Sequence, residues 1–321
     1  MHAYIIRRLL LMLPSLLMVT LIVFFLVRFI PGDVIDIMVV EMTQATGAGA
    51  AEKTAEALRT QLGLDKPVYL QYWEWLTDVL RGDLGSSLWT RRSVGSDILR
   101  RLPVSSELGI LGMAIALIMA LPIGVYSAIR QDTAGDYFGR SLAILFISVP
   151  YFWLGTVIVV YPSVWWGWMP PMRYIPLVDN PVGNLKQFII PAFVVGTVFT
   201  GTIMRMTRTM MLEVLRQDYI RTAWAKGLSE RVIVLRHALK NALIPVVTIL
   251  GMQLPIVIAG AVVTETIFAL PGIGFYLLEA IGRRDYPVIS GINLIVASFV
   301  VVINLLVDIT YAYLDPRIHY K

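Results

Sequence analysis

The chain has 321 residues, of which 57% are hydrophobic and only 15% are charged, and its mean hydropathy is +0.72. Soluble domains carry about 25% charged residues, so this composition excludes an ordinary soluble domain and indicates a lipid environment. Cysteine is absent, and the only histidines are His2, His237 and His319. Disulfides, thiolate catalysis, a zinc site and a serine-type triad are therefore excluded.

The net charge of +5 comes from a single segment. Between Arg205 and Lys240 there are eight basic and three acidic residues, whereas the rest of the chain holds 19 of each sign. A nucleic-acid-binding surface is therefore not expected, and the basic segment needs an explanation of its own.

Six stretches are long and apolar enough to cross a bilayer, which takes about 20 mainly apolar residues in a helix. We therefore expect an all-α integral membrane protein with six transmembrane helices, near residues 9–30, 104–128, 141–162, 188–210, 243–266 and 289–313. The first stretch lacks a small-residue cleavage site and is interpreted as a retained span. Arg28 lies at its end, where its long side chain reaches the headgroups.

Orientation follows from the loops, because loops rich in Lys and Arg stay in the cytoplasm. Both termini and the loops 129–140 and 205–242 then lie inside, and a long extracytoplasmic loop follows the first helix. We expect three regions: an N-terminal transmembrane helix (1–30), an extracytoplasmic loop region (31–103), and a five-helix core (104–321) that contains loop 205–242.

The basic loop is expected to hold two short helices. The letters DYIRTAWAK (218–226) favour a helix, Gly227 can take a positive φ at its C-terminal end, and Ser229 can cap the next helix. Apolar residues of the second helix share one face at 3.6 residues per turn: Val232, Leu235, Leu239 and Leu243. Charges that only set the topology, with the helices lying on anionic headgroups, are the alternative.

This loop resembles the cytoplasmic EAA loop of ABC importer permeases. Aligned on Gly227, the general pattern is also matched at Ala223 and Leu239, and YIRTAWAKGLSE followed by RHALKNALIPV is similar to the variant of the peptide and nickel branch. Further matches lie along nearly the whole chain: PGD at 31–33, LGLDKPVYLQYWEWL at 62–76, RGDLGSS at 81–87, ALPGIGFYLLEAIGRRDYPV at 269–288, and the ending YAYLDPRI at 311–318. The chain is identified as a member of this branch, similar to the first of the two permease subunits of dipeptide, oligopeptide and nickel importers.

The resemblance implies a transport assembly in a bacterial or archaeal cytoplasmic (inner) membrane. This chain would form half of the pathway with a second homologous permease subunit, two ATP-binding subunits and an extracytoplasmic substrate-binding protein. It would be no enzyme and hold no cofactor, since ATP and Mg are bound by the ATPase subunits. Its loop between the fourth and fifth spans would be the coupling helix, with ATPase-coupling residues Asp218, Tyr219, Arg221, Thr222, Ala223, Lys226, Gly227 and Ser229.

The segment GAGAAEKT (47–54) nearly matches a phosphate-binding loop. Glu52 stands where that motif needs a glycine, and it would place a carboxylate beside the phosphates. The segment also lies in the expected extracytoplasmic loop. A nucleotide site in this chain is therefore not expected.

Polar residues inside the spans are few, which suits a transporter whose specificity resides in a separate protein. Packed or hydrated roles are the alternative to a transport path for each of them. The candidates for a pathway or gate are Thr264, Glu265, Asn293 and Asn304, beside Gln253 and Asp308. In the long loop, YLQYWEWLTDVL is expected to form an interfacial or packing helix, and the resemblance suggests that the loop docks the binding protein through Tyr72, Trp73 and Trp75.

Three other classes of protein are the alternatives. A purely structural scaffold is compatible with the composition, but the organised cytoplasmic loop disfavours it. An ion-driven secondary transporter would show broken spans in matching halves and paired intramembrane charges, and no charged pair accompanies Pro122, Pro150, Pro245 and Pro255. A membrane enzyme would need a motif such as HExxH or GxSxG, and neither occurs. The cargo stays open among peptides, nickel complexes, glutathione and oligosaccharides.

Overall fold

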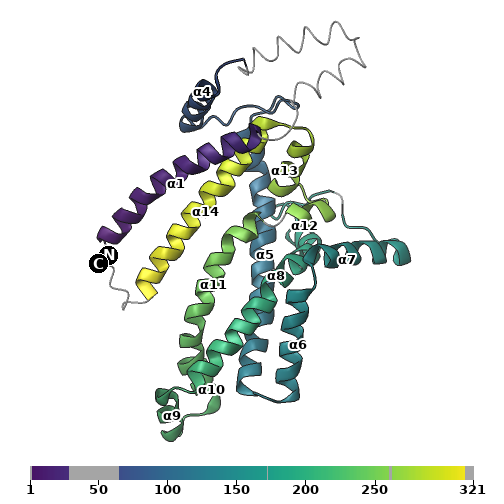
Figure 1. Cartoon of the computed structure of the whole chain (residues 1–321). Coiled ribbons are helices and arrows are strands. Elements are labelled where there is room, and N and C mark those ends of the chain that lie inside the picture. The colour runs from purple at the N-terminus through teal and green to yellow at the C-terminus, as the bar shows by residue number, and fades with distance from the viewer. Residues whose placement is uncertain (1, 29–64, 172, 260–261, 315–321) are drawn as a thin grey trace. The chain divides into compact units, whose positions relative to one another are not determined.

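The computed structural model describes residues 2–28, 65–171, 173–259 and 262–314 (Figure 1). These divide into two compact units, Met1–Pro103 with Phe275–Val302 and Val104–Gly274 with Ile303–Lys321. Within the described ranges the regular structure is helical, with one isolated bridge between Ser86 and Ser93. The PGD and GAGAAEKT segments, the end of the chain from residue 315, and the side chain of Asp308 lie outside the described residues.

The first unit contains helices α1 (His2–Arg28) and α4 (Val68–Leu80), together with parts of α5 (Val94–Ile129), α13 (Ile273–Gly282) and α14 (Tyr286–Leu314). Helix α4 packs its aromatic face on α1. The Phe24 ring lies edge-on to Tyr72, with 5.1 Å between the ring centroids, and the Tyr72 and Thr20 hydroxyls are hydrogen-bonded at 2.9 Å. Because aromatic residues recur at helical spacing in YLQYWEWLTDVL, one face of α4 can cover α1.

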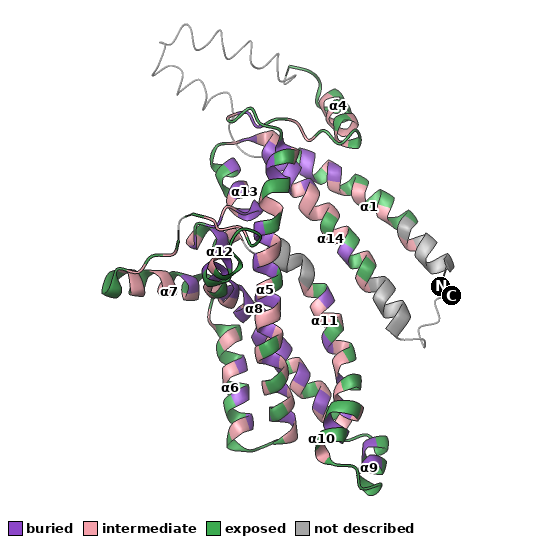
Figure 2. Cartoon of the chain, turned by 180° about the vertical axis from the view of Figure 1, so that it is seen from behind, coloured by how far each residue is buried: buried purple, intermediate pink, exposed green. Residues whose placement is uncertain are grey.

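The second unit holds most of α5 (Val94–Ile129) and a continuous series of further helices. They are α6 (Ala134–Ser148), α7 (Tyr151–Trp166), α8 (Pro181–Leu215), α9 (Asp218–Ala225), α10 (Glu230–Val232), a π-helical turn (Ile233–Ala238), α11 (Leu239–Ala259) and α12 (Val262–Ile267). Its core is built around α8, whose buried side chains include Phe188, Phe199 and Ile203. Figure 2 shows this burial along α8, in contrast to the mostly exposed α6.

Five described helices are long and apolar enough to span a membrane: Leu10–Arg28, Val94–Ile129, Pro181–Leu215, Glu230–Gln253 and Tyr286–Val307. The prediction of an all-helical membrane protein is confirmed. The inside and outside assignment stays a prediction.

The expected span at 141–162 is not one continuous helix in the structure. It consists of α6 and α7, which are bent by 89° where they meet, so a sixth span exists only if this pair counts as one. Pro150 explains the break, because proline lacks an N–H and forces the preceding residue out of the helical region. Val149 accordingly has φ −83° and ψ 119°.

Candidate functional site

The proposed coupling helix is α9, which ends in a tight glycine turn. Gly227 has a φ of +76°, as the sequence predicts. Its N–H donates to the Trp224 carbonyl oxygen at 2.9 Å, and the Leu228 N–H donates to the Ala223 carbonyl oxygen at 3.4 Å. These two bonds form a Schellman motif, which uses a left-handed residue to satisfy the last carbonyl groups of a helix.

The inner face of α9 packs within the second unit. Ile220 is fully buried and Ala223 is 7% exposed, and both lie in one apolar cluster with Ile233, Val234 and Ala238. Ala223 therefore makes its close contacts inside this chain. The small alanine side chains allow α9 and the following segment to approach closely.

The expected apolar face of the second helix is only partly right, because Leu239 and Leu243 are half-buried and pack against the core, whereas the first two residues of that face do not. Val232 and Leu235 are exposed, whereas Ile233, Val234 and Ala238 are buried. This helix has two sets of apolar side chains on different faces, and the set with the smaller side chains packs inward. The segment also adopts a π-helical turn at Ile233–Ala238, which changes the helical phase. Ser229 occupies the N-cap position, but its side chain makes no capping hydrogen bond.

The outer face of α9 is exposed and mixed in character. The charged pair Asp218 and Arg221 lies 3.3 Å apart with both side chains at least 75% exposed, so the pair contributes only about 0–1 kcal/mol. The Asn241 side-chain amide donates to the Tyr219 hydroxyl at 2.8 Å, which ties α9 to α11. Thr222, Lys226 and Ser229 are exposed.

Sequence reasoning missed Trp224, which is 48% exposed on the same helix. Tyr219 and Leu228 are exposed beside it in sequence. Tryptophan and tyrosine are enriched among residues that dominate protein interfaces. That enrichment could have identified Trp224 as a candidate contact residue from the sequence. The exposed side chains of α9 therefore include two residue types that are common in interfaces.

The gate candidates Thr264 and Glu265 are fully buried in α12. The Ser105 hydroxyl donates to Glu265 Oε1 at 2.5 Å and accepts the Ile273 N–H at 2.8 Å. A Cβ on Gly272 would lie 2.3 Å from the Glu265 carboxyl carbon, so a larger residue there would displace the carboxylate. Glu265 and Ser105 thus attach the LPGIG turn to α5.

The other two gate candidates lie in α14. Asn293 is half-buried and its side-chain amide donates to the Ile289 carbonyl oxygen at 2.8 Å within the helix, whereas Asn304 is exposed. Gln253, in α11, is half-buried.

Replacing Ser105 with Ala is expected to destabilise the protein by about 2 kcal/mol. The change removes a donor from a buried carboxylate and the acceptor of the Ile273 N–H, and buried unpaired groups cost about 1–3 kcal/mol each. Thermal unfolding of the purified protein in detergent measures the effect. Ser106→Ala, at a partly exposed neighbour, is the matched control, and equal stability of the two variants would contradict this role of Ser105.

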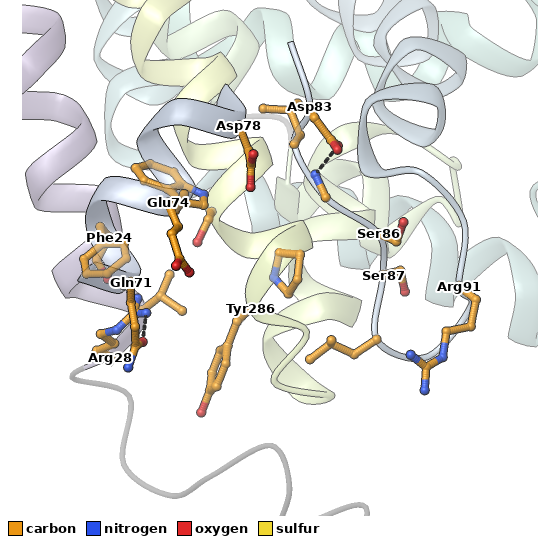
Figure 3. Close-up of a pocket in the computed structure, with 17 residues that line it drawn as sticks. Phe24, Arg28, Gln71, Glu74, Asp78, Asp83, Ser86, Ser87, Arg91 and Tyr286 are labelled. Carbon is orange, nitrogen blue, oxygen red and sulfur yellow. Dashed lines mark hydrogen bonds between the residues drawn. The ribbon is translucent and has the colours of Figure 1, made fainter. Parts of the chain in front are cut away.

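Two of the three docking candidates in α4 serve internal packing. Tyr72 and Trp75 pack on Phe24, the latter at 5.7 Å between ring centroids, while Trp73 is 66% exposed. The polar side of α4 lines a cavity of about 510 Å³ in the first unit. Figure 3 shows Glu74 and Asp78 of this helix among the lining residues.

The family-like motifs RGDLGSS and GRRDYP meet beside this cavity. Asp285 accepts hydrogen bonds from the Ser87 hydroxyl at 2.5 Å and the Leu88 N–H at 3.1 Å. Nearby in the same unit, the Tyr276 hydroxyl donates to Asp97 at 3.3 Å. Burial raises the pKa of Tyr276 to about 12, which further favours the neutral phenol. In the described ranges, acidic and histidine side chains form no group of three or more able to hold a metal.

Two family models match the sequence. The model described as "Binding-protein-dependent transport system inner membrane component" covers residues 120–320, and the N-terminal model of the same system covers residues 1–109. Together they account for nearly the whole chain.

Three relatives are similar over the full length of both chains. They are a putative peptide transport system permease protein of Brucella suis (41% identity over 320 residues), the dipeptide transport system permease protein DppB of Escherichia coli K12 (39% over 344) and the di/tripeptide transport system permease protein DppB of Pseudomonas aeruginosa (40% over 341). Each alignment covers 100% of this chain and of the relative.

One solved structure, described as an amino acid ABC transporter with histidines, has a similar fold. Its TM-score is 0.53 at 10% sequence identity, and the match covers 68% of this chain and 94% of that chain. With the apolar helices, the two family models and relatives of about 40% identity, the chain belongs to the family of inner-membrane components of binding-protein-dependent transport systems, in which it is a multi-pass permease subunit.

Proposed function

We propose that this permease imports short peptides, delivered by a binding protein and driven by ATP hydrolysis on separate subunits. The observation that carries the proposal is the full-length identity of 39–41% to three permeases named for peptide, dipeptide or di/tripeptide transport. Nickel complexes, glutathione and oligosaccharides are the competing cargoes.

A permease of this family has no catalytic activity and no cofactor of its own, and its ATPase partners are separate proteins. Binding-protein dependence implies a binding protein as well as ATPase subunits. The finer composition belongs to the proposal: a second homologous permease, two ATP-binding subunits, and a binding protein on the extracytoplasmic side.

In the proposed mechanism α9 is the element that the ATPase holds. Its buried face, with Ile220 and Ala223, joins it firmly to the second unit, and its outer face offers Tyr219 and Trp224. A short helix fixed on one side transmits a displacement to the spans without bending. The proposed ATPase contacts are the exposed members of the set, Asp218, Tyr219, Arg221, Thr222, Lys226, Gly227 and Ser229, with Trp224 added.

The other proposed sites are a gate, a transport path and a contact to the binding protein. Thr264 and Glu265 belong to a gate that the LPGIG turn supports, and Asn293 and Asn304 line the path. Trp73 is the proposed contact to the binding protein, because it is exposed, whereas Tyr72 and Trp75 hold α4 on α1.

Reconstitution into liposomes tests the cargo and the energy source together. The permease is assembled with its second permease, ATPase subunits and binding protein, and dipeptide uptake and ATP hydrolysis are measured. We expect dipeptide-loaded binding protein to stimulate hydrolysis and uptake. If only a nickel complex or an oligosaccharide stimulates hydrolysis and uptake, that compound and not a peptide is the cargo. Uptake by this chain alone under an ion gradient would overturn the ATP-driven mechanism.

A further inference from the structure

A cavity of about 270 Å³ lies between α6 and α8 in the second unit. Three arginines line it at one end, Arg140 from α6 and Arg205 and Arg208 from α8. We call this space the arginine cavity. Neither the coupling helix nor the gate candidates contribute to its lining.

The charges of the arginine cavity are only partly neutralised. Asp136 forms two hydrogen bonds of 2.7 Å with Arg208. Arg140 and Arg205 are exposed, and neither forms an ion pair with any residue in the described ranges. Three arginines and one aspartate leave a net charge of +2.

An unpartnered hydroxyl also lines the arginine cavity. Ser127 of α5 is 1% exposed, and its Oγ has no hydrogen-bond partner among the described residues. A buried hydroxyl without a partner is costly, and a ligand with acceptor oxygens would satisfy it. This observation is independent of the arginines and indicates the same kind of ligand.

The other end of the arginine cavity is apolar. Ala143, Ile144, Ile147 and Met204 line it, and Ile144 is 63% exposed and Ile147 46% exposed. Arg140 directly precedes the apolar run SLAILFI of α6. The cavity therefore joins a positive end to an apolar surface where an apolar helical run begins. The charge distribution of the loops predicts that this end lies on the cytoplasmic side.

We propose that the arginine cavity binds the headgroup of an anionic phospholipid. The phosphate lies against Arg140 and Arg205, the Ser127 hydroxyl donates to a phosphate oxygen, and the first part of an acyl chain lies along Ile144 and Ile147. Basic pockets between transmembrane helices on the cytoplasmic side suit such headgroups. Inorganic phosphate would meet the same arginines but would gain nothing from the apolar end.

Cysteine labelling of the assembled transporter tests the proposal. The chain has no cysteine, so Thr209→Cys places one reporter on an exposed residue that lines the cavity. Maleimide labelling of this chain is followed in nanodiscs of phosphatidylcholine, with or without phosphatidylglycerol, and in phosphatidylcholine with inorganic phosphate. We expect phosphatidylglycerol to slow labelling about tenfold and inorganic phosphate to leave the rate unchanged.

Charge-removing variants decide whether the arginines are responsible. Arg140→Gln combined with Arg205→Gln should weaken phosphatidylglycerol binding about 30-fold, because each basic residue near a membrane surface is worth about 1 kcal/mol. If the double variant does not assemble, Arg140→Gln alone, which changes an exposed side chain, is used to test the role of the arginines. Arg216→Gln removes an exposed arginine outside the cavity and should keep the protection.

Four results would overturn the proposal. The first is equal labelling with and without phosphatidylglycerol, and the second is protection that survives the loss of both arginines. The third is slow labelling in every nanodisc, which would mean that a neighbouring subunit covers the cavity. Protection by inorganic phosphate equal to that by phosphatidylglycerol would also reject a lipid site.

Discussion

Asp136→Asn is expected to lower the stability of the permease by about 3–5 kcal/mol, the usual cost of removing one partner of a buried ion pair. Asp136 is fully buried, and it accepts two hydrogen bonds from Arg208 at 2.7 Å and one from the Asp132 N–H at 3.0 Å. The variant leaves the guanidinium of Arg208, only 19% exposed, without its counter-charge. Thermal unfolding of the purified protein should shift by about 10 °C.

Two further variants separate the ion pair from other effects of the substitution. Asp136→Asn combined with Arg208→Gln should recover part of the loss, because no unpaired charge then remains. Asp132→Asn changes an exposed neighbouring carboxylate and should leave the unfolding temperature nearly unchanged. If the double variant is no more stable than Asp136→Asn, the attraction between the two charges does not account for the effect.

Gly227→Val is expected to reduce peptide uptake about tenfold or more while membrane insertion and ATP hydrolysis continue. The φ of +76° at Gly227 is strongly unfavourable for a β-branched residue, with a cost of order 1–3 kcal/mol. No atom lies within 4 Å of a Cβ built at this position, so backbone conformation alone opposes the valine. Relaxing that strain breaks the Schellman motif and changes the direction in which α9 projects.

Gly227→Asn is the matched control, because asparagine tolerates the left-handed region far better than valine does. It should retain most of the uptake at a similar side-chain volume. Uptake and ATP hydrolysis are measured side by side in liposomes that contain the complete transporter. Normal uptake by the valine variant would contradict the placement of the coupling element at α9, even if peptide transport itself is established.

Helix α9 and the segment after it differ in how much of their structure could be predicted from the local sequence. The positive φ at Gly227 was predictable, since helix-forming letters followed by glycine specify a C-terminal cap through local sterics. The buried face of the second helix was not predictable, because two different sets of apolar residues on this helix both recur at helical spacing. Only packing against Ile220 and Ala223 decided that Ile233, Val234 and Ala238 turn inward.

The sequence by itself determined the membrane character of the chain and the approximate positions of five long apolar helices, because hydropathy is a local property of the chain. The 89° bend between α6 and α7 emerged only from the structure. Tertiary structure alone decided that Asp136 meets Arg208 and that Ser105 meets Glu265, which are 72 and 160 residues apart. It also decided that Tyr72 packs inside while Trp73 stays exposed. Such pairings depend on which helices lie side by side. The periodicity of one segment predicts which of its faces is apolar, but it does not predict which helix packs against that face.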